Sequence, residues 1–124
     1  MSRDRNVLGE PLSPCCHSPK TGFYRDGFCR VGDNDPGVHS VCAMVTEEFL
    51  AFSFAQGNDL LTPRPEFGFV GLQPGDRWCL CARRWKQAAE VGLAPPIYLS
   101  GTHEKTLEII TLEKLQQHAL DASR

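Results

Sequence analysis

Two cysteines, Cys79 and Cys81, flank Leu80 in a short segment that also contains a tryptophan. Residues two apart on a β-strand point to the same face, so both sulfurs of such a strand would face one volume. Two thiolates on one face can share a metal ion or take part in thiol redox chemistry. This pair is therefore the first candidate for a chemical site in the chain.

A zinc ion takes about four ligands, so the pair would need partners from elsewhere in the chain to bind one. The residues that could complete the set are cysteines and histidines. The predicted metal set consists of Cys29, Cys42, Cys79 and Cys81, with His39 and His103 as further donors. The Cys-x-x-Cys spacing of zinc knuckles is absent. The alternative is that the cysteines are buried and act as small apolar residues of the sheet.

Cys15 and Cys16 precede His17 in a proline-rich stretch near the N-terminus. An imidazolium next to an exposed thiol favours the thiolate. Neighbouring cysteines rarely bridge each other, because a disulfide needs its two α-carbons farther apart than one peptide step. The pair is thus either an incidental surface pair, or Cys15 acts as a resolving thiol toward a cysteine of the folded body.

His39 and His103 each stand where a loop meets a predicted element, a position from which side chains often point into a shared pocket. Either imidazole could act as a general base, oriented by Glu104, Asp26 or Asp59. Together with the two cysteines they form the predicted catalytic set: Cys79, Cys81, His39 and His103. The alternative for each histidine is a hydrogen bond to neighbouring backbone.

Arginine and aspartate stand beside turn glycines at two places, Arg25-Asp26-Gly27 and Gly75-Asp76-Arg77. A guanidinium group pairs well with carboxylates and other anions. The long Gly/Pro-rich loop between residues 59 and 77 is a second reason to expect binding here. The predicted ligand-binding residues are Arg25, Asp26, Asp59, Arg64, Asp76 and Arg77. The alternative is that the aspartates only stabilise turns.

Composition limits the class of protein. The 124 residues suit one domain, 1–124, and 41% hydrophobic with 23% charged residues is ordinary globular usage. A net charge of −2 and short basic runs argue against nucleic acid as a partner. No apolar run reaches about 20 residues and no signal peptide is visible, so we expect a cytoplasmic protein without a membrane partner. Six cysteines are too few for a disulfide scaffold, so we expect them to serve another purpose.

The elements that would position these residues point to an α+β fold: a small, mainly antiparallel sheet with about three helices and long Gly/Pro-rich loops. Residues 1–20 are expected as an extended proline-rich arm. Thr46 and Thr111 are predicted N-caps of helices. The predicted helices cover 47–56, 82–91 and the residues after Thr111, and the predicted strands are 28–31 paired with 38–45, then 77–81, 97–99 and 107–110.

Several segments together resemble one family. They include Thr21-Gly-Phe-Tyr-Arg-Asp-Gly, Gly57-Asn-Asp-Leu, Thr62-Pro-Arg-Pro-Glu and Gly71-Leu-Gln-Pro-Gly-Asp-Arg-Trp-Cys-Leu-Cys-Ala. The chain resembles the bacterial domain-of-unknown-function 2237 family from about Asn6 through Leu115. The resemblance implies a small cytoplasmic protein of unassigned activity. The sequence departs from the family at Phe28, where a second cysteine often precedes Cys29, and at Val70, where proline is frequent.

Two functions remain open, and the sequence does not decide whether the protein is an enzyme. The first is a thiol- or metal-dependent site built from cysteine and histidine, either catalytic or sensory. The second is a non-catalytic module that binds a small molecule or a protein through the loop 59–77, with structurally buried cysteines.

Overall fold

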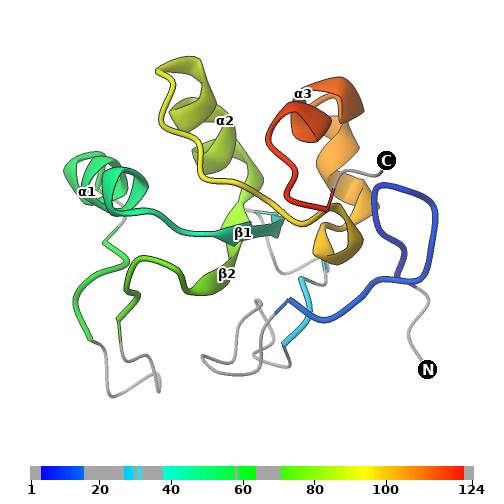
Figure 1. The fold of residues 1–124 in the computed structure, drawn as a ribbon, viewed down its shortest axis with the longest axis horizontal. Helices are drawn as coiled ribbons and strands as arrows, with labels where there is room; N and C mark the ends of the chain where they lie inside the picture. The colour runs from blue at the N-terminus through cyan, green and yellow to red at the C-terminus, as the bar shows by residue number, and fades with distance from the viewer. Residues whose placement is uncertain are drawn as a thin grey trace.

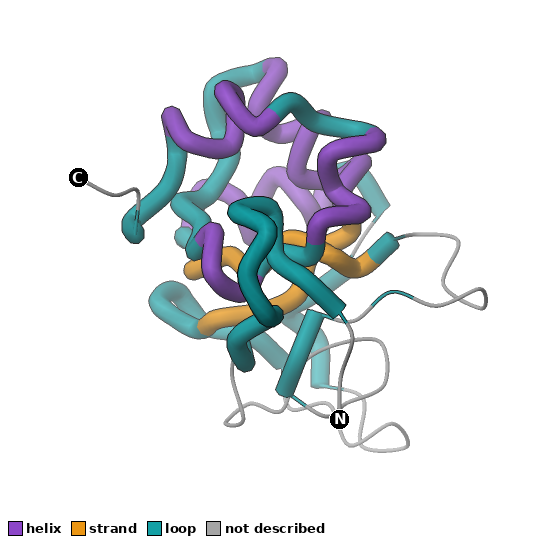
Figure 2. The backbone as a smooth tube through the Cα atoms, turned by 90° about the vertical axis from the view of Figure 1, so that its right-hand side faces the viewer, coloured by secondary structure: helices purple, strands orange, loops and turns teal. Residues whose placement is uncertain are grey.

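The computed structural model of the chain describes residues 4–15, 27–29, 31, 38–57, 59–63 and 71–121. Within these ranges the chain has a two-stranded antiparallel sheet and three α-helices, so the predicted α+β fold is confirmed. Both views place the α-helices on one side of the strand pair (Figure 1, Figure 2). The other side of the strand pair is where the candidate site lies.

The sheet consists of β1, His39–Met44, and β2, Arg77–Cys81. The two strands are antiparallel, and Cys42 stands opposite Cys79. The predicted pairing of 38–45 with 28–31 is wrong, because β1 pairs with β2 instead. Of the range 28–31, the structure describes Phe28, Cys29 and Val31, and none of these three lies in a strand.

The α-helices begin where local chemistry favours them. In α1, Glu47–Ala55, the Thr46 hydroxyl accepts a hydrogen bond from the Phe49 amide at 3.1 Å, as an N-cap does. In α3, Leu112–Gln117, Thr111 accepts from the Lys114 amide at 3.2 Å. Both predicted caps are confirmed. The third helix is α2, Ala82–Glu90. Within the described ranges, no helix combines the length and the apolar character needed to cross a membrane.

Two predicted strands overlap short 3-10 helices in the structure. The first, η2, Leu99–Gly101, includes the last residue of the predicted strand 97–99, and the Asp121 carboxylate accepts from the amides of Leu99 and Ser100 at its start. Ile97 alone keeps bridge pairing, to Ala43 and Ala119. The second, η3, Glu104–Glu108, covers the start of the predicted strand 107–110.

The strand pair separates two kinds of interior. Val41 and Ala43 of β1 and Trp78 and Leu80 of β2 belong to the main hydrophobic core. The helices supply the rest of this core, including the fully buried Trp85 of α2. Cys42 and Cys79 alternate with these residues and belong to a second buried cluster. The alternation of side chains along each strand therefore assigns hydrocarbon to one face and sulfur to the other.

Candidate functional site: a buried cluster of four cysteines

Four cysteines form two disulfides. Cys15 is bonded to Cys42 and Cys29 to Cys79, with α-carbon separations of 5.6 and 5.3 Å. All four are buried, with at most 2% of the surface of each residue exposed. This differs from the expectation that the cysteines serve a purpose other than disulfide formation. Each bond joins one cysteine of a loop to one cysteine of the strand pair.

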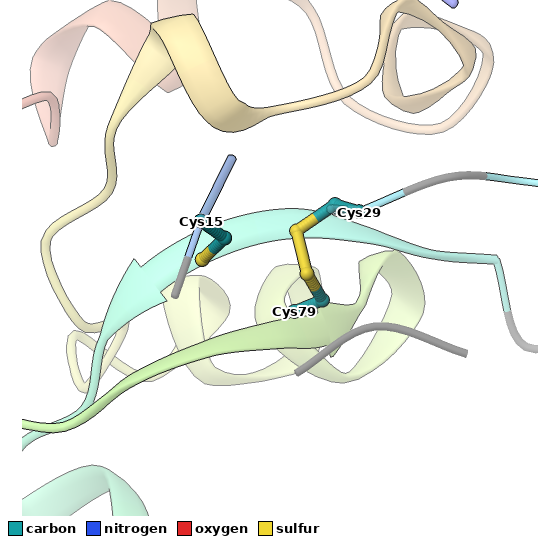
Figure 3. Close-up of side chains that lie close together, drawn as sticks. All are labelled: Cys15, Cys29 and Cys79. Carbon is teal, nitrogen blue, oxygen red and sulfur yellow. A yellow bond between two sulfur atoms is a disulfide. The ribbon is translucent and has the colours of Figure 1, made fainter. Parts of the chain in front are cut away.

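The four sulfurs form one compact group. The sulfur atoms of Cys15, Cys29 and Cys79 all lie within 4.8 Å of one another (Figure 3). The Cys42 sulfur is not among the atoms that all lie within 4.8 Å of one another, but it is bonded to that of Cys15 and belongs to the same buried cluster. The two disulfides are thus neighbours, and a sulfur of one lies within reach of both sulfurs of the other.

The strand register explains half of this group. Cys42 and Cys79 are directly opposite each other. The backbone of Cys42 bonds away from β2: its amide donates to the Thr102 hydroxyl at 3.1 Å, and its carbonyl accepts from the Tyr98 amide at 2.8 Å. Cys42 and Cys79 are therefore a pair without direct backbone hydrogen bonds, the kind in which side chains approach most closely.

The loop half of the group is positioned by backbone contacts. The Cys15 amide donates to the Gly27 carbonyl at 2.6 Å, so the segments that carry Cys15 and Cys29 are tied to each other. The Ser13 amide donates to the Ser100 carbonyl at 3.0 Å. Within the predicted arm 1–20, the described residues 4–15 fold back, since Arg5 and Pro11 form an antiparallel bridge.

Two residues close the group from the side of η2. A Cβ atom on Gly101 would lie 3.0 Å from the Cys42 sulfur, so any larger residue would require this neighbour to shift by a few tenths of an ångström. The ring of Tyr98 packs against the four-cysteine cluster. The guanidinium carbon of Arg77 lies 4.0 Å from the centre of that ring. On this side, the Gly101 backbone and the Tyr98 ring therefore cover the cluster, and the Arg77 guanidinium lies over that ring.

The predicted metal set is partly assembled. The structure brings Cys29, Cys42 and Cys79 together, but the fourth member of the group is Cys15. Cys81 is partly exposed, stands at the N-cap of α2, and is free of disulfides among the cysteines that the structure describes. Cys16 lies outside the described residues. The sequence offered Cys15 only as a resolving thiol, and no local spacing marks it as a neighbour of Cys79.

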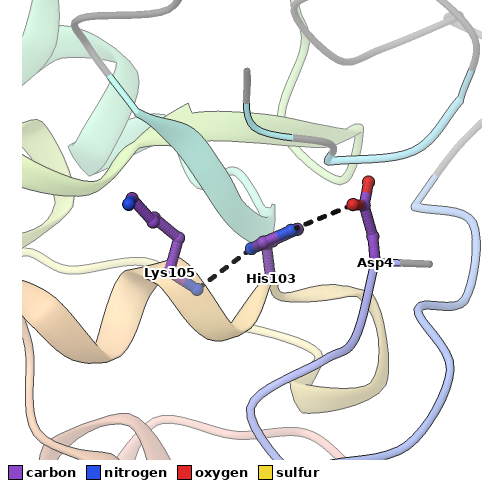
Figure 4. Close-up of polar contacts among 3 residues, drawn as sticks. All are labelled: Asp4, His103 and Lys105. Atoms are coloured by element: carbon purple, nitrogen blue, oxygen red, sulfur yellow. Dashed lines mark hydrogen bonds and ion pairs between the residues drawn. The ribbon is translucent and has the colours of Figure 1, made fainter. Parts of the chain in front are cut away.

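The two histidines of the predicted catalytic set stand on neighbouring segments, because the His103 amide donates to the carbonyl of Ser40, the residue after His39, at 2.9 Å. His39 stands opposite Cys81 at the end of the strand pair. His103 is buried, and its Nδ1 accepts from the Lys105 amide at 3.0 Å (Figure 4). Its Nε2 lies 3.6 Å from a carboxylate oxygen of Asp4. Both ring nitrogens of His103 thus face partners outside the four-cysteine cluster.

The predicted ligand-binding residues have structural contacts where the structure describes them. Asp59 accepts from the amides of Leu61 and Thr62 at 2.9 and 3.0 Å. Asp76 accepts from the Gln73 amide at 2.9 Å. These bonds are typical of aspartates that close turns. The guanidinium of Arg77 lies over the Tyr98 ring. The other three predicted residues, Arg25, Asp26 and Arg64, lie outside the described residues.

Comparison with known proteins gives a family. The family model described as "Uncharacterized protein conserved in bacteria (DUF2237)" matches residues 5–119. No curated protein matches the chain. The match covers most of the 124 residues and includes all four cysteines of the cluster. The chain therefore belongs to the DUF2237 family of uncharacterised bacterial proteins.

Proposed function

We propose that this protein is a thiol-based redox sensor of the bacterial cytoplasm, in which the Cys15–Cys42 and Cys29–Cys79 disulfides form and are reduced reversibly. The observation that carries the proposal is the packing of four buried sulfurs into one group on the sulfur face of the strand pair. Disulfides of cytoplasmic proteins are usually transient and take part in catalysis or sensing.

The arrangement of the bonds suits a sensor. Each disulfide ties a loop cysteine, Cys15 or Cys29, to a strand cysteine. Reduction would free the loop segments while the main core, on the other face of the strands, keeps its apolar contacts. Oxidation state would thus control how the N-terminal segments are held, and a partner that recognises one arrangement would respond to it.

The chemistry is ordinary thiol–disulfide exchange. A thiolate of a dithiol reductant attacks one sulfur, a mixed disulfide forms, and the second thiol of the reductant releases it. Each disulfide takes up two electrons and two protons, and the reductant leaves as its own disulfide. Two equivalents of a dithiol therefore convert both bonds into four thiols.

The stabilisation expected from each disulfide is a large fraction of the total stability of a domain of this size. Chain-entropy loss in the unfolded state predicts about 3.5 kcal/mol for a cross-link spanning 27 residues and about 4 kcal/mol for one spanning 50, each taken alone. Domains of this size are stable by about 5–15 kcal/mol in total. Reduction should consequently shift the balance between folded and locally opened states.

The competing function, a binding module that uses the loop 59–77, has less support. The carboxylates of Asp59 and Asp76 already accept backbone amides within their own turns. The Arg77 side chain lies over Tyr98, which packs on the cysteine cluster. These contacts support structural roles for three of the predicted ligand-binding residues.

Redox titration tests the proposal. We expect folded protein in glutathione buffers of increasing reducing strength to gain four alkylated cysteines, and reoxidation to restore the same two pairs, as read by peptide mass spectrometry. The double variant Cys15→Ala/Cys42→Ala should lose about 3 kcal/mol of unfolding free energy when oxidised and little when reduced. Cys81→Ala is the matched control and should change neither state. Reduction that occurs only together with global unfolding would show that the disulfides are purely structural and would refute a sensor.

A further inference from the structure

We propose that the reduced form of this cluster binds one zinc ion through the sulfurs of Cys15, Cys29, Cys42 and Cys79. This inference rests on the proposed function, because zinc binds thiolates and not disulfides. It adds a specific ligand to the reduced state, and makes release of that ligand a consequence of oxidation.

The positions of the sulfurs suit a single tetrahedral ion. Zinc–sulfur bonds of about 2.3 Å place the sulfurs of a tetrahedron about 3.8 Å apart. The sulfurs of Cys15, Cys29 and Cys79 already lie within 4.8 Å of one another, and that of Cys42 is bonded to Cys15. Opening the two bonds lets each sulfur pair move apart, and lets the Cys42 sulfur, which is outside the group of three, turn toward the sulfurs of Cys29 and Cys79 by side-chain rotation.

The compactness and the donor type both favour zinc. In iron–sulfur clusters the cysteines are divided among two or more iron atoms, so their sulfurs are spread around several metals. Four sulfurs confined to one group instead fit one metal ion. A tetrahedral set of four thiolates is typical of structural zinc sites, in which no coordination position is left for water. The burial of all four cysteines agrees with such a closed site.

The surroundings can accept the resulting charge. Four thiolates around Zn²⁺ have a net charge of −2, which requires nearby positive groups or dipoles. Arg77 precedes Cys79 by two residues on β2, and its guanidinium lies over Tyr98, the ring that packs on the cluster. Cys81 is outside the group and partly exposed, so it serves as a cysteine that should not bind the ion.

The two states are related by a balanced reaction. Binding of Zn²⁺ to four thiols releases four protons to the solvent. Oxidation of the tetrathiolate to the two disulfides releases Zn²⁺ and gives four electrons to two equivalents of a small disulfide oxidant, such as oxidised glutathione. That oxidant is reduced to thiols, which take up protons from the solvent. Zinc release would therefore accompany sensing.

Anaerobic metal titration tests this inference. Protein reduced with a phosphine and freed of metal is titrated with Co²⁺ as the probe and then with Zn²⁺. We expect the visible and thiolate charge-transfer bands of tetrahedral cobalt to saturate at one equivalent and to disappear as zinc displaces cobalt. Cys15→Ala should weaken binding by more than about 100-fold, the upper cost of losing a group that only orients a metal ligand. Cys81→Ala should bind like the natural chain, and circular dichroism should show both variants folded.

The outcomes separate this inference from the proposed function. Reversible disulfide formation without cobalt or zinc binding would overturn the zinc site and leave the sensor intact. If the folded disulfides resist reduction, the sensor fails, and protein refolded from the reduced state with one equivalent of zinc still tests the site by elemental analysis. Binding that survives in Cys15→Ala, or that is lost in Cys81→Ala, would overturn the ligand set. One equivalent of iron in place of zinc in protein purified without oxygen would overturn the choice of metal.

Discussion

The two faces of the strand pair are held by different interactions. On one face, Val41 and Leu80 contact a core completed by the helices, which is stabilised by removal of apolar surface from water. On the other face, the strand cysteines Cys42 and Cys79 are bonded to loop cysteines. The first kind of stabilisation does not involve the disulfides, whereas the second includes two bonds that exist only while the cysteines are oxidised.

One small domain can thus combine a face held by apolar packing with a face held by disulfides. The strands belong to both, because their side chains alternate between the faces. Reduction of the disulfides should therefore alter the loops that carry Cys15 and Cys29 without unfolding the helices. A substitution on one face should likewise have the same effect on stability in oxidised and reduced protein, unless the two faces are coupled.

The largest effect is expected from the hydrocarbon face. Trp85 is fully buried, and its indole N–H donates to the Pro95 carbonyl at 3.0 Å. Trp85→Ala should lower the unfolding free energy by about 3–5 kcal/mol, because it leaves a cavity and an unpaired carbonyl. Denaturant unfolding should give the same loss in oxidised and reduced protein. Lys86→Ala, at an exposed neighbouring position, is the control. A loss that depends strongly on redox state would show that the two faces are not independent.

A smaller effect is expected at the sulfur face. In Gly101→Ala, the new methyl group would meet the Cys42 sulfur at 3.0 Å and its Cβ at 3.1 Å. Such overpacking costs about 1–3 kcal/mol of unfolding free energy. We also expect faster reduction of the Cys15–Cys42 bond, followed by timed alkylation and mass spectrometry. Ser100→Ala, one residue earlier, should leave both quantities unchanged. Equal reduction rates in Gly101→Ala and the natural chain would mean that this glycine does not restrain the cluster.

Features that depend on nearby residues could be predicted from the sequence, and features that depend on distant residues could not. The caps at Thr46 and Thr111 depend on atoms within four residues, so residue type alone indicated both helix starts. The α+β class followed from such local patterns. The pairing of β1 with β2 joins segments more than 30 residues apart, and nothing in the local pattern of either strand identifies its partner.

The candidate site shows the same limit. Alternation around Leu80 indicated a sulfur face, and Cys79 lies there with Cys42 and Cys29. Cys15 joins them only because residues 4–15 pack along residues 100–104 through long-range backbone bonds, such as Val7 to Thr102. These bonds leave no pattern in the sequence. Cys81 shares the spacing of the pair but stands where β2 ends and α2 begins, outside the group of sulfurs.

The smallest predicted effect concerns protonation at the edge of the hydrocarbon face. His118 lies edge-on to Trp85, with ring centres 5.1 Å apart. Burial, and secondarily the charge of Lys114, lowers the pKa of His118 below its ordinary value of 6.5. The unfolded chain therefore binds this proton more readily than the folded one, so the unfolding free energy should fall as pH drops below about 6.5 and level off below the folded pKa.

Unfolding curves at several pH values, compared between the natural chain and His118→Gln, isolate this contribution. The variant should lack the part of the pH dependence that belongs to the imidazole. Lys114→Gln should reduce that part without removing it, because burial, the larger cause of the lowered pKa, remains. A pH dependence identical in the natural chain and His118→Gln would assign it to another group. Since His118 contacts Trp85 on the hydrocarbon face, its contribution to the pH dependence of the unfolding free energy should be the same in oxidised and reduced protein. A difference between the two would show that the two faces are coupled.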